Sequence, residues 1–370
     1  MRPRFWRSLW DTLPSFRRSA FPEKILRTGG GAAVQPRISI VVPVYNSARD
    51  LRDCLSALVA SCRAESEIIV VDDASTDDSA SVAAEMGARV FRQPKNFGPS
   101  AARNVGSRHA RGEILFFVDA DLVVMPGAVD RVVALMDADP TVAAVFGSYD
   151  CRPRVKGVVS EYRNLLHHYV HQKGNAEAST FWGACGAIRR RVFEEVGGFD
   201  EKRFPRCIED IELGYRLRRA GHRIRLDKGL QGTHLKRWTL RSLIRTDVGC
   251  RAVPWTRLIL ERGAPDDLNL KVGQRASVAL VALAVLALAL APFRLEFAGV
   301  SAAALLVVIV LNRSLYGLFF RYRGLWFTVA AIGLHVLYYL YGGLTYLYVW
   351  CRFHLTRLTT SGEPLRETRS

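Results

Sequence analysis

The hydrophobic positions between residues 38 and 145 follow two alternating patterns. Short apolar runs rich in β-branched residues recur, as in "ISIVVPVYN" (38–46), "EIIVVDDAS" (67–75) and "EILFFVDAD" (113–121). The stretches between them carry their apolar residues at the spacing that is typical of helices. Strands and helices that take turns in this way predict a largely parallel sheet with helices on both faces.

Carboxylates stand directly after two of these predicted strands. Asp72 and Asp73 follow one run, and Asp119 and Asp121 follow another. Because right-handed crossovers place the carboxyl ends of parallel strands along one edge, we expect these side chains to lie at a ligand site. Positions i and i+2 of a strand point to the same side, so Asp119 and Asp121 could hold a Mg²⁺ or Mn²⁺ ion that bridges ligand phosphates.

The composition changes after about residue 275. Two uncharged runs, "ASVALVALAVLALALAP" (276–292) and "FAGVSAAALLVVIVL" (297–311), are separated by four residues, and we expect them to form a tight helical hairpin. A further run, 325–350, is long enough to cross a bilayer and carries Tyr and Trp toward its ends. Residues 276–351 are therefore predicted to form transmembrane helices, as a hairpin plus one span.

The number of spans stays open at this stage. Three spans would place the arginines of the tail, residues 352–370, on the side opposite a cytoplasmic N-terminal domain, against the usual excess of positive charge in the cytoplasm. A re-entrant or interfacial segment such as "LYGLFF" (315–320) would restore the balance.

Two basic segments flank the predicted domain. Residues 1–37 combine arginines with Phe, Trp and Leu at helical spacing and end in a glycine-rich linker, which fits either an interfacial helix or a disordered basic arm. Residues 241–275 include many arginines among Trp, Leu and Ile. They are predicted to form amphipathic helices on the cytoplasmic membrane surface, or else exposed helices of the soluble domain.

Charge and cysteine content narrow the range of partners. The chain has 52 Lys and Arg against 35 Asp and Glu, a net charge of +17, so acidic partners are expected. No helix-turn-helix, zinc-finger or RRM pattern accompanies the charge, so we expect membrane lipids or phosphorylated substrates and no nucleic acid. Seven cysteines without a C-x-x-C spacing indicate reduced thiols that face a cytoplasm, and argue against a zinc site.

Six motifs resemble those of family 2 glycosyltransferases. They are "SIVVPVYN" (39–46), "VVDDASTDDS" (70–79), "NFGPSAARNVG" (96–106), "FFVDADL" (116–122), "GGFDE" (197–201) and "IEDIELGYRLRRAG" (208–221). Their order and spacing match the family over residues 38–240. The resemblance implies a GT-A fold, which is Rossmann-like with a mostly parallel sheet, and an inverting, metal-dependent transfer of a sugar from a nucleotide-diphosphate sugar.

The resemblance also implies a donor side of the site. The residues expected to bind the donor are Pro43, Tyr45, Asp72, Asp73, Asn96, Gly98, Arg103 and Asp119. Asp73 could instead cap a helix, and Arg103 could be a solvated helix residue. The metal ligands implied are Asp119, Asp121 and His234, although His234 could also be purely structural.

On the acceptor side, the resemblance assigns the catalytic base to Asp210, with Glu209 in support. Both could also act as first-turn acids that favour the following helix, and the two roles are compatible. Trp182, Arg237 and Trp238 are the predicted acceptor contacts. Trp182 could stack on a sugar face or belong to the packed interior.

These expectations describe an integral protein of the cell inner membrane with its catalytic domain in the cytoplasm. The expected acceptor is a lipid-linked or other glycan of cell-envelope assembly. A processive polysaccharide synthase is an alternative, but "THLKRW" (233–238) has His234 where such enzymes carry the glutamine of a Q-x-x-R-W motif. A nucleotidyltransferase would need a glycine-rich phosphate loop after the first strand, which is missing. A catalytically inactive membrane scaffold is the non-enzymatic alternative. The sugar, the nucleotide and the exact acceptor are not encoded in these motifs.

Overall fold

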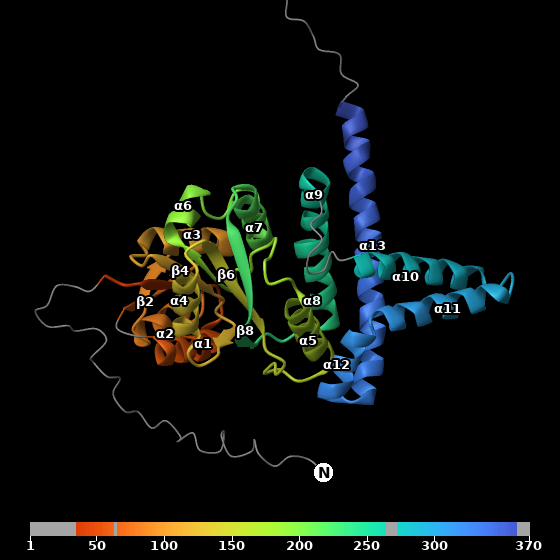
Figure 1. The fold of residues 1–370 in the computed structure, drawn as a ribbon, viewed down its shortest axis with the longest axis horizontal. Coiled ribbons are helices and arrows are strands. Elements are labelled where there is room, and N and C mark those ends of the chain that lie inside the picture. Colours follow the sequence, from red (N-terminus) through yellow and green to blue (C-terminus); the bar gives the residue numbers. More distant parts are fainter. Residues whose placement is uncertain (1–34, 63–64, 264–271, 361–370) are drawn as a thin grey trace, which may run out of the picture. The chain divides into compact units, whose positions relative to one another are not determined.

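The computed structural model describes residues 35–62, 65–263 and 272–360, and the side chains up to residue 356. The predicted segment 1–37 lies almost wholly outside the described residues. The described chain contains an eight-stranded sheet with the strand order β3-β2-β1-β4-β7-β6-β8-β5 (Figure 1). The strands are β1 Ile38–Val44, β2 Ser66–Asp72, β3 Arg89–Arg92, β4 Ile114–Val118, β5 Leu122–Val124, β6 Val142–Tyr149, β7 Cys185–Arg189 and β8 Arg223–His234.

The sheet is mixed. The pairs β1–β2, β1–β4, β2–β3 and β6–β8 are parallel, as the alternation of strands and helices predicts. The pairs β4–β7, β6–β7 and β5–β8 are antiparallel. The α/β fold is therefore confirmed, and the parallel half that carries Asp72 and Asp119 is continued by a half in which β7 runs against both neighbours.

Helices cover both faces of the sheet and divide the core in two. They are α1 Ala48–Ser61, α2 Ser79–Glu85, α3 Pro99–His109, α4 Ala128–Ala138, α5 Val158–Lys173, α6 Arg190–Glu195 and α7 Glu209–Arg219. Neighbouring residues of one strand point to opposite faces, so Phe116 joins the core beneath α1 and α4, whereas Phe117 joins the core beneath α3 and α7. Both faces of β4 are thus buried, which explains its unbroken apolar sequence.

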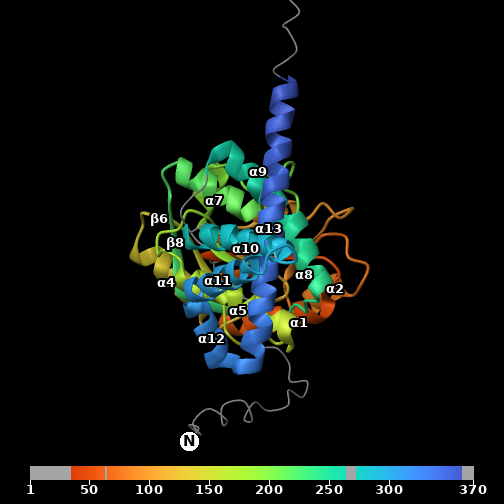
Figure 2. The same cartoon turned by 90° about the vertical axis from the view of Figure 1, so that its right-hand side faces the viewer.

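The helices after the sheet form a separate layer beside the domain (Figures 1 and 2). They are α8 Leu240–Arg245, the π-helical turn η2 Thr246–Ala252, α9 Val253–Arg262, α10 Val272–Leu290, α11 Glu296–Leu311, α12 Arg313–Arg323 and α13 Leu325–Thr360. In the described part of the chain, α10 and α13 are each long and apolar enough to cross a membrane. The helices α11 and α12 meet at 71° and would give a third candidate span if they count as one.

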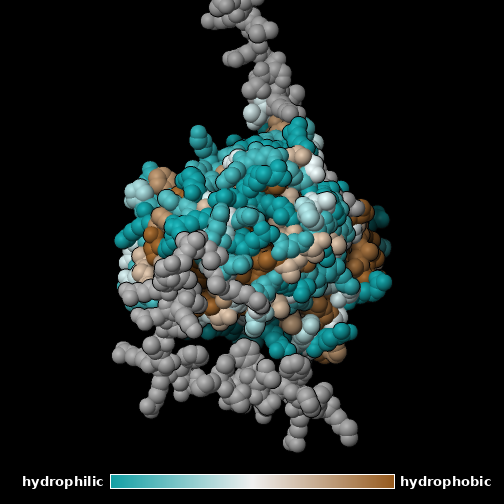
Figure 3. Space-filling model, turned by 60° about the vertical axis from the view of Figure 1, so that its left-hand side comes forward, coloured by the Kyte–Doolittle hydropathy of each residue, from teal (hydrophilic) through white to brown (hydrophobic). Residues whose placement is uncertain are grey.

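The surface differs between the two layers. The side shown in Figure 3 is mainly hydrophilic where its residues are coloured. By contrast, α10 and α11 expose aliphatic side chains, among them Leu286, Leu288 and Leu306, each at about 60% of its full surface. Apolar exposure on this scale marks a surface that contacts lipid or protein.

Candidate active site

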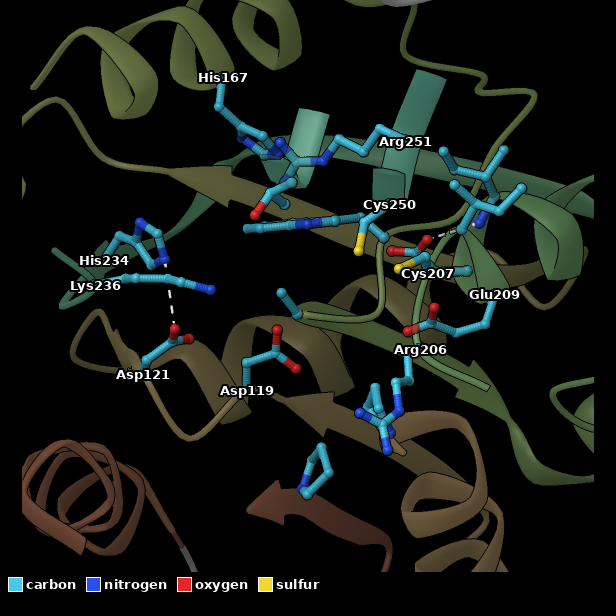
Figure 4. Close-up of a pocket in the computed structure, with 18 of the residues that line it drawn as sticks. Asp119, Asp121, His167, Arg206, Cys207, Glu209, His234, Lys236, Cys250 and Arg251 are labelled. Atoms are coloured by element: carbon cyan, nitrogen blue, oxygen red, sulfur yellow. Dashed lines mark hydrogen bonds and ion pairs between the residues drawn. The ribbon is translucent and has the colours of Figure 1, made fainter. Parts of the chain in front are cut away.

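A cavity of about 600 Å³ opens at the carboxyl ends of β1, β2 and β4. Most of the side chains predicted from sequence line it, and Figure 4 shows several of them around the open space. The predicted residues in the wall are Pro43, Tyr45, Asp73, Asn96, Gly98, Arg103, Asp119, Asp121, Trp182, Glu209, Asp210, His234 and Trp238. Asp72 and Arg237 are the two predicted residues that do not line this cavity.

The two aspartates after β2 have different surroundings. Asp72 is completely buried, accepts a hydrogen bond from the backbone N–H of Ser75 and lies 3.2 Å from Arg92 Nε. Asp73 lines the cavity, and its carboxylate accepts hydrogen bonds from the backbone N–H groups of Phe97 and Gly98, both at 2.8 Å. It does not cap a helix, because α2 begins only at Ser79, so that alternative is wrong. Asp73 instead fixes the loop that leads into α3.

Arg103 connects the two carboxylate motifs. Its guanidinium donates to Asp119 Oδ1 at 2.6 Å and to Glu209 Oε1 at 2.7 Å, while only 4% of its side chain is exposed. The alternative of a solvated helix residue is therefore wrong. Burial alone would lower the pKa of Arg103, but the charges of Asp119 and Glu209 outweigh it and raise the pKa above its usual value. The arginine is a permanent positive charge between the two motifs.

Asp119 and Asp121 lie side by side in the loop between β4 and β5, with about a third of each side chain exposed (32% and 28%). The ring of His234, at the end of β8, stacks on Tyr149 and places Nε2 3.6 Å from Asp121 Oδ2 (Figure 4). Burial would raise the pKa of Asp121, but His234 and then Lys236 reverse this effect and lower it. Asp121 is therefore held as a carboxylate.

These three side chains fit a hard divalent cation. Within the described residues, no three His, Cys, Asp or Glu side chains are already arranged around a metal position. Mg²⁺ and Mn²⁺, however, are commonly held by one or two carboxylates while ligand phosphates and water complete the shell. Asp119 and Asp121 offer such a partial shell that faces the cavity, with the imidazole of His234 beside it.

Asp210, in the first turn of α7, also lines the cavity. Its carboxylate accepts hydrogen bonds from the backbone N–H groups of Gly183 at 3.0 Å and Ile211 at 2.8 Å. Burial, and then the neighbouring charge of Glu209, raise the pKa of Asp210 to about 7. A carboxyl group with this pKa can exchange a proton near neutral pH.

Strained backbone surrounds the same cavity. In the described chain, three residues other than glycine have a positive φ: Asn46 at 50°, Ala74 at 63° and Ile208 at 56°. Each is the direct neighbour of a residue that lines the cavity, and Ile208 itself lines it. For a β-branched residue this conformation costs free energy and persists only when the surroundings enforce it. Ile208 is held by packing against Phe204 and Leu258, which fixes the position of Glu209 and Asp210.

The predicted acceptor residues are placed in different ways. Trp182 lines the cavity and also packs edge-on against Tyr149, so its position is compatible with both of the expected roles. Trp238 is buried and lines the cavity, and Lys236 lies 4.6 Å from the centre of its ring. Arg237 is exposed and lies outside the cavity wall, so its predicted acceptor contact has no support from its position. The residue before it, Lys236, lines the cavity instead.

Sequence reasoning missed a charged network from three helices. Asp247 of η2 is buried and lies 2.8 Å from Arg251 and 3.4 Å from Arg163 of α5, and it accepts a hydrogen bond from the Tyr341 hydroxyl of α13 at 2.7 Å. Both arginines line the cavity. Asp247 and Arg251 belong to a π-helical turn, a feature that often marks functional sites. Because π-helices have no reliable sequence pattern, this signal could not be read from the sequence.

Gly98 supports a first prediction. With φ +98°, a Cβ at this position would lie 2.2 Å from the carbonyl oxygen of Pro205. Gly98→Ala is expected to destabilise the protein by about 3 kcal/mol, through backbone strain and the clash together. The matched control is Gly127→Ala, which has φ +74° but no atom within 4 Å of the new Cβ. The thermal midpoint of the purified protein should fall clearly further for G98A, and equal midpoints would contradict the close approach.

Comparisons with known proteins agree with this geometry. The model of the glycosyl transferase family 2 matches residues 39–197. Two curated relatives are a probable glycosyltransferase YdaM of Bacillus subtilis, 29% identical over 206 residues, and the pre-mycofactocin glycosyltransferase of Mycobacterium tuberculosis, 32% identical over 225 residues. The alignments cover 51% and 56% of this chain and 48% and 44% of those proteins. The chain thus matches less than half the length of either relative.

A solved structure extends the likeness to the fold. The mannosyltransferase PcManGT from Pyrobaculum calidifontis, in complex with GDP-Man and Mn²⁺, is 20% identical and has a TM-score of 0.54, with 85% of this chain and 88% of that chain covered. At this identity the likeness shows the fold alone. The chain therefore carries a family 2 glycosyltransferase domain of the GT-A fold, followed by a helical region with two candidate membrane spans.

Proposed function

We propose that this protein is an inverting, metal-dependent glycosyltransferase that moves a sugar from a nucleotide-diphosphate donor to a lipid-linked or other glycan acceptor. The observation that carries the proposal is the arrangement of one cavity. Asp119 and Asp121 line one part of it, Glu209 and Asp210 line another, and Arg103 binds Asp119 and Glu209 at once.

The donor occupies the side of the cavity formed by the ends of β1 and β2. Asp73 and the loop that it fixes offer hydrogen-bonding groups for a nucleobase and ribose, and Tyr45, 50% exposed, offers a ring face for stacking. A Mn²⁺ or Mg²⁺ ion held by Asp119 and Asp121, with His234 beside them, would supply positive charge to the leaving diphosphate. PcManGT supports this assignment because its structure contains GDP-Man and Mn²⁺.

Asp210 then acts on the acceptor. A hydroxyl is a weak nucleophile until its proton is removed, and the raised pKa of Asp210 matches a base that works near neutral pH. The two backbone N–H groups that bind its carboxylate fix the direction in which the proton is taken. Attack from the face opposite the leaving diphosphate would invert the configuration at the anomeric carbon. Glu209, bound to Arg103, supports the site without touching the acceptor proton.

The helical region favours an acceptor at a membrane. α10 and α13 are candidate spans, and the cavity wall includes residues of η2 and Tyr338 of α13. We therefore infer an integral protein of the inner membrane with a cytoplasmic catalytic domain, and a lipid-linked acceptor in cell-envelope glycan assembly. Arg206 and Lys236, which line the cavity, would also suit an acceptor that carries phosphate.

Transfer by the purified full-length chain tests this function. The protein in lipid nanodiscs should release nucleoside diphosphate from one member of a panel of nucleotide sugars only when Mn²⁺ or Mg²⁺ is present. Membranes supplied with the radiolabelled donor should carry the label into an extractable lipid fraction. Label found only in soluble products would contradict the lipid-linked acceptor, and no release from any donor would contradict the enzyme.

The pKa of Asp210 gives a second prediction. The base must be ionised, so kcat should fall about tenfold for each pH unit below about 7 and level off above it. The groups that face Asp210 are Glu209 on its own helix and Arg103 on α3, so the measured value belongs to this set of groups. The profile is measured from initial rates at saturating donor and acceptor. A rate that does not change between pH 5.5 and 8 would contradict a base with a pKa of about 7.

A further inference from the structure

We propose that the α10–α11 hairpin is the part of the chain that crosses the membrane, and that α13 lies along the membrane surface on the side of the catalytic domain. The partner surface is a lipid bilayer with anionic headgroups. This inference concerns the path of the chain and does not depend on the proposed activity.

The middle of α13 faces the catalytic cavity. Tyr338 lines the cavity that also contains Asp119 and Asp210, and the Tyr341 hydroxyl donates to the buried Asp247. Both tyrosines lie near the centre of the apolar stretch Leu325–Thr356. The centre of a spanning helix lies in the hydrocarbon core, where a water-soluble domain with an Asp247–Arg251 ion pair cannot follow it. A helix along the surface places its middle beside the domain without this conflict.

Another face of α13 is apolar and exposed. Trp326, Val329, Leu344 and Leu347 are exposed by 86%, 55%, 60% and 56%. They share one face: Val329 follows Trp326 by three residues, as Leu347 follows Leu344, and the two pairs are about five helical turns apart. Tyr and Trp occur along the whole helix, including its middle, whereas a span concentrates them near its two ends. Aromatic residues that are spread over the whole length of a helix fit the membrane interface better than the hydrocarbon core.

The hairpin is attached to the middle of α13. Val281 of α10 and Val308 of α11 pack against Tyr339, and Leu340 joins the same cluster. Its base carries polar contacts: the Asn312 side chain donates to the Ser277 hydroxyl, and the Tyr339 hydroxyl lies 2.9 Å from Asn312 Oδ1. In Figures 1 and 2 the hairpin runs crosswise to α13 and away from the sheet. Two helices that cross in this way cannot both stand upright in one bilayer.

The length and charge of the hairpin fit a crossing. With 19 and 16 residues, α10 and α11 are about 28 Å and 24 Å long, close to the thickness of the hydrocarbon core. No charged residue lies between Arg275 and Arg294, or between Glu296 and Arg313. Arg275 and Arg313 are at the base, whereas the loop carries Arg294 beside Glu296. The excess positive charge thus lies at the base, on the side that holds the catalytic domain, as anionic lipid and the positive-inside tendency favour.

The proposal makes Cys351 an informative native probe. All seven cysteines lie within the described residues and outside the hairpin, and Cys351 is near the far end of α13. If α13 lies on the surface, every native thiol is on the side of the catalytic domain. Because α12 packs against α5 of the catalytic domain, the chain is back on that side before α13 begins, and a crossing α13 would bring Cys351 to the opposite side.

Labelling of spheroplasts with a membrane-impermeant maleimide tests this arrangement in the full-length protein. We expect no label on the wild-type chain, and label on Phe293→Cys, whose position in the hairpin loop is 81% exposed. Both proteins should be labelled after permeabilisation. A green fluorescent protein fused to the C-terminus should fluoresce, which gives a second readout that needs no cysteine variant.

Three results would overturn the proposal. Label on the wild-type chain that disappears in Cys351→Ser would show that α13 crosses. Protection of Phe293→Cys until permeabilisation would show that the hairpin does not. Activity of an alkaline phosphatase fused to the C-terminus, which is active only outside the cell, would contradict the placement of the C-terminus on the side of the catalytic domain.

Discussion

Asp210→Asn is expected to lower kcat by about 10²–10⁴-fold, because asparagine cannot take the proton of an acceptor hydroxyl. The substitution keeps the size of the side chain and one oxygen that accepts the Gly183 N–H bond. Substrate binding should therefore change much less than turnover. Initial rates over a range of acceptor concentrations separate the two effects.

The same substitution should not destabilise the fold. In the folded protein the pKa of Asp210 is raised to about 7, so the charged form is disfavoured there relative to the unfolded chain. A group of this kind lowers stability as the pH rises between its unfolded pKa and its folded pKa. At pH 8, removal of the charge relieves this cost, whereas the Ile211 N–H that binds Oδ1 loses its acceptor, so the thermal midpoint should change little. Loss of activity with retained stability is what distinguishes a catalytic base from a structural acid.

Glu195→Gln is the matched control for this experiment. Glu195 is the last residue of α6, its side chain is 50% exposed, and it lies outside the cavity wall. This variant should keep both the rate and its pH profile. If D210N retained wild-type turnover, the base would have to be another group. If it lost its fold as well as its activity, Asp210 would be a structural acid, and the loss of turnover would not identify it as the base.

The sequence predicted the positions of Asp73 and Asp119 well because local pattern and topology agree there. Strands β1, β2 and β4 have strong β-branched or aromatic runs, and each leads into the polar residues of one motif. Parallel pairing then brings Asp73 and Asp119 to one edge without any further information. Both aspartates line the cavity as expected.

The other half depends on contacts between distant residues. Strand β7, "CGAIR", contains one β-branched residue, so its sequence gives little strand signal, and only pairing with β4 and β6 defines it. Arg163 and Tyr341 meet at Asp247 from helices that are far apart in the chain, which no local pattern indicates. Whether Lys236 or Arg237 lines the cavity depends on how the chain leaves β8.

The carboxylates after β4 give the second large effect. Asp121→Asn is expected to lower kcat/KM by about 10²–10³-fold, about 3–4 kcal/mol, because one of the two carboxylates that we propose to hold the metal is lost. The loss should appear first in donor binding, since Asp121 lies on the donor side with His234. Thermal stabilisation by the nucleotide sugar in the presence of Mn²⁺ should shrink or disappear in this variant.

The choice of Asp121 avoids a structural side effect. Asp119 is bound to Arg103, so its loss would also disturb Glu209, which shares that arginine. Asp121 pairs with His234, a residue of the same donor side, so its effect should remain local. Glu85→Gln, with a side chain that is 61% exposed, is the matched control and should bind metal and donor as the wild type does. If D121N kept metal-dependent donor binding, the cation would have to be held elsewhere, and Asp121 would serve only to orient His234.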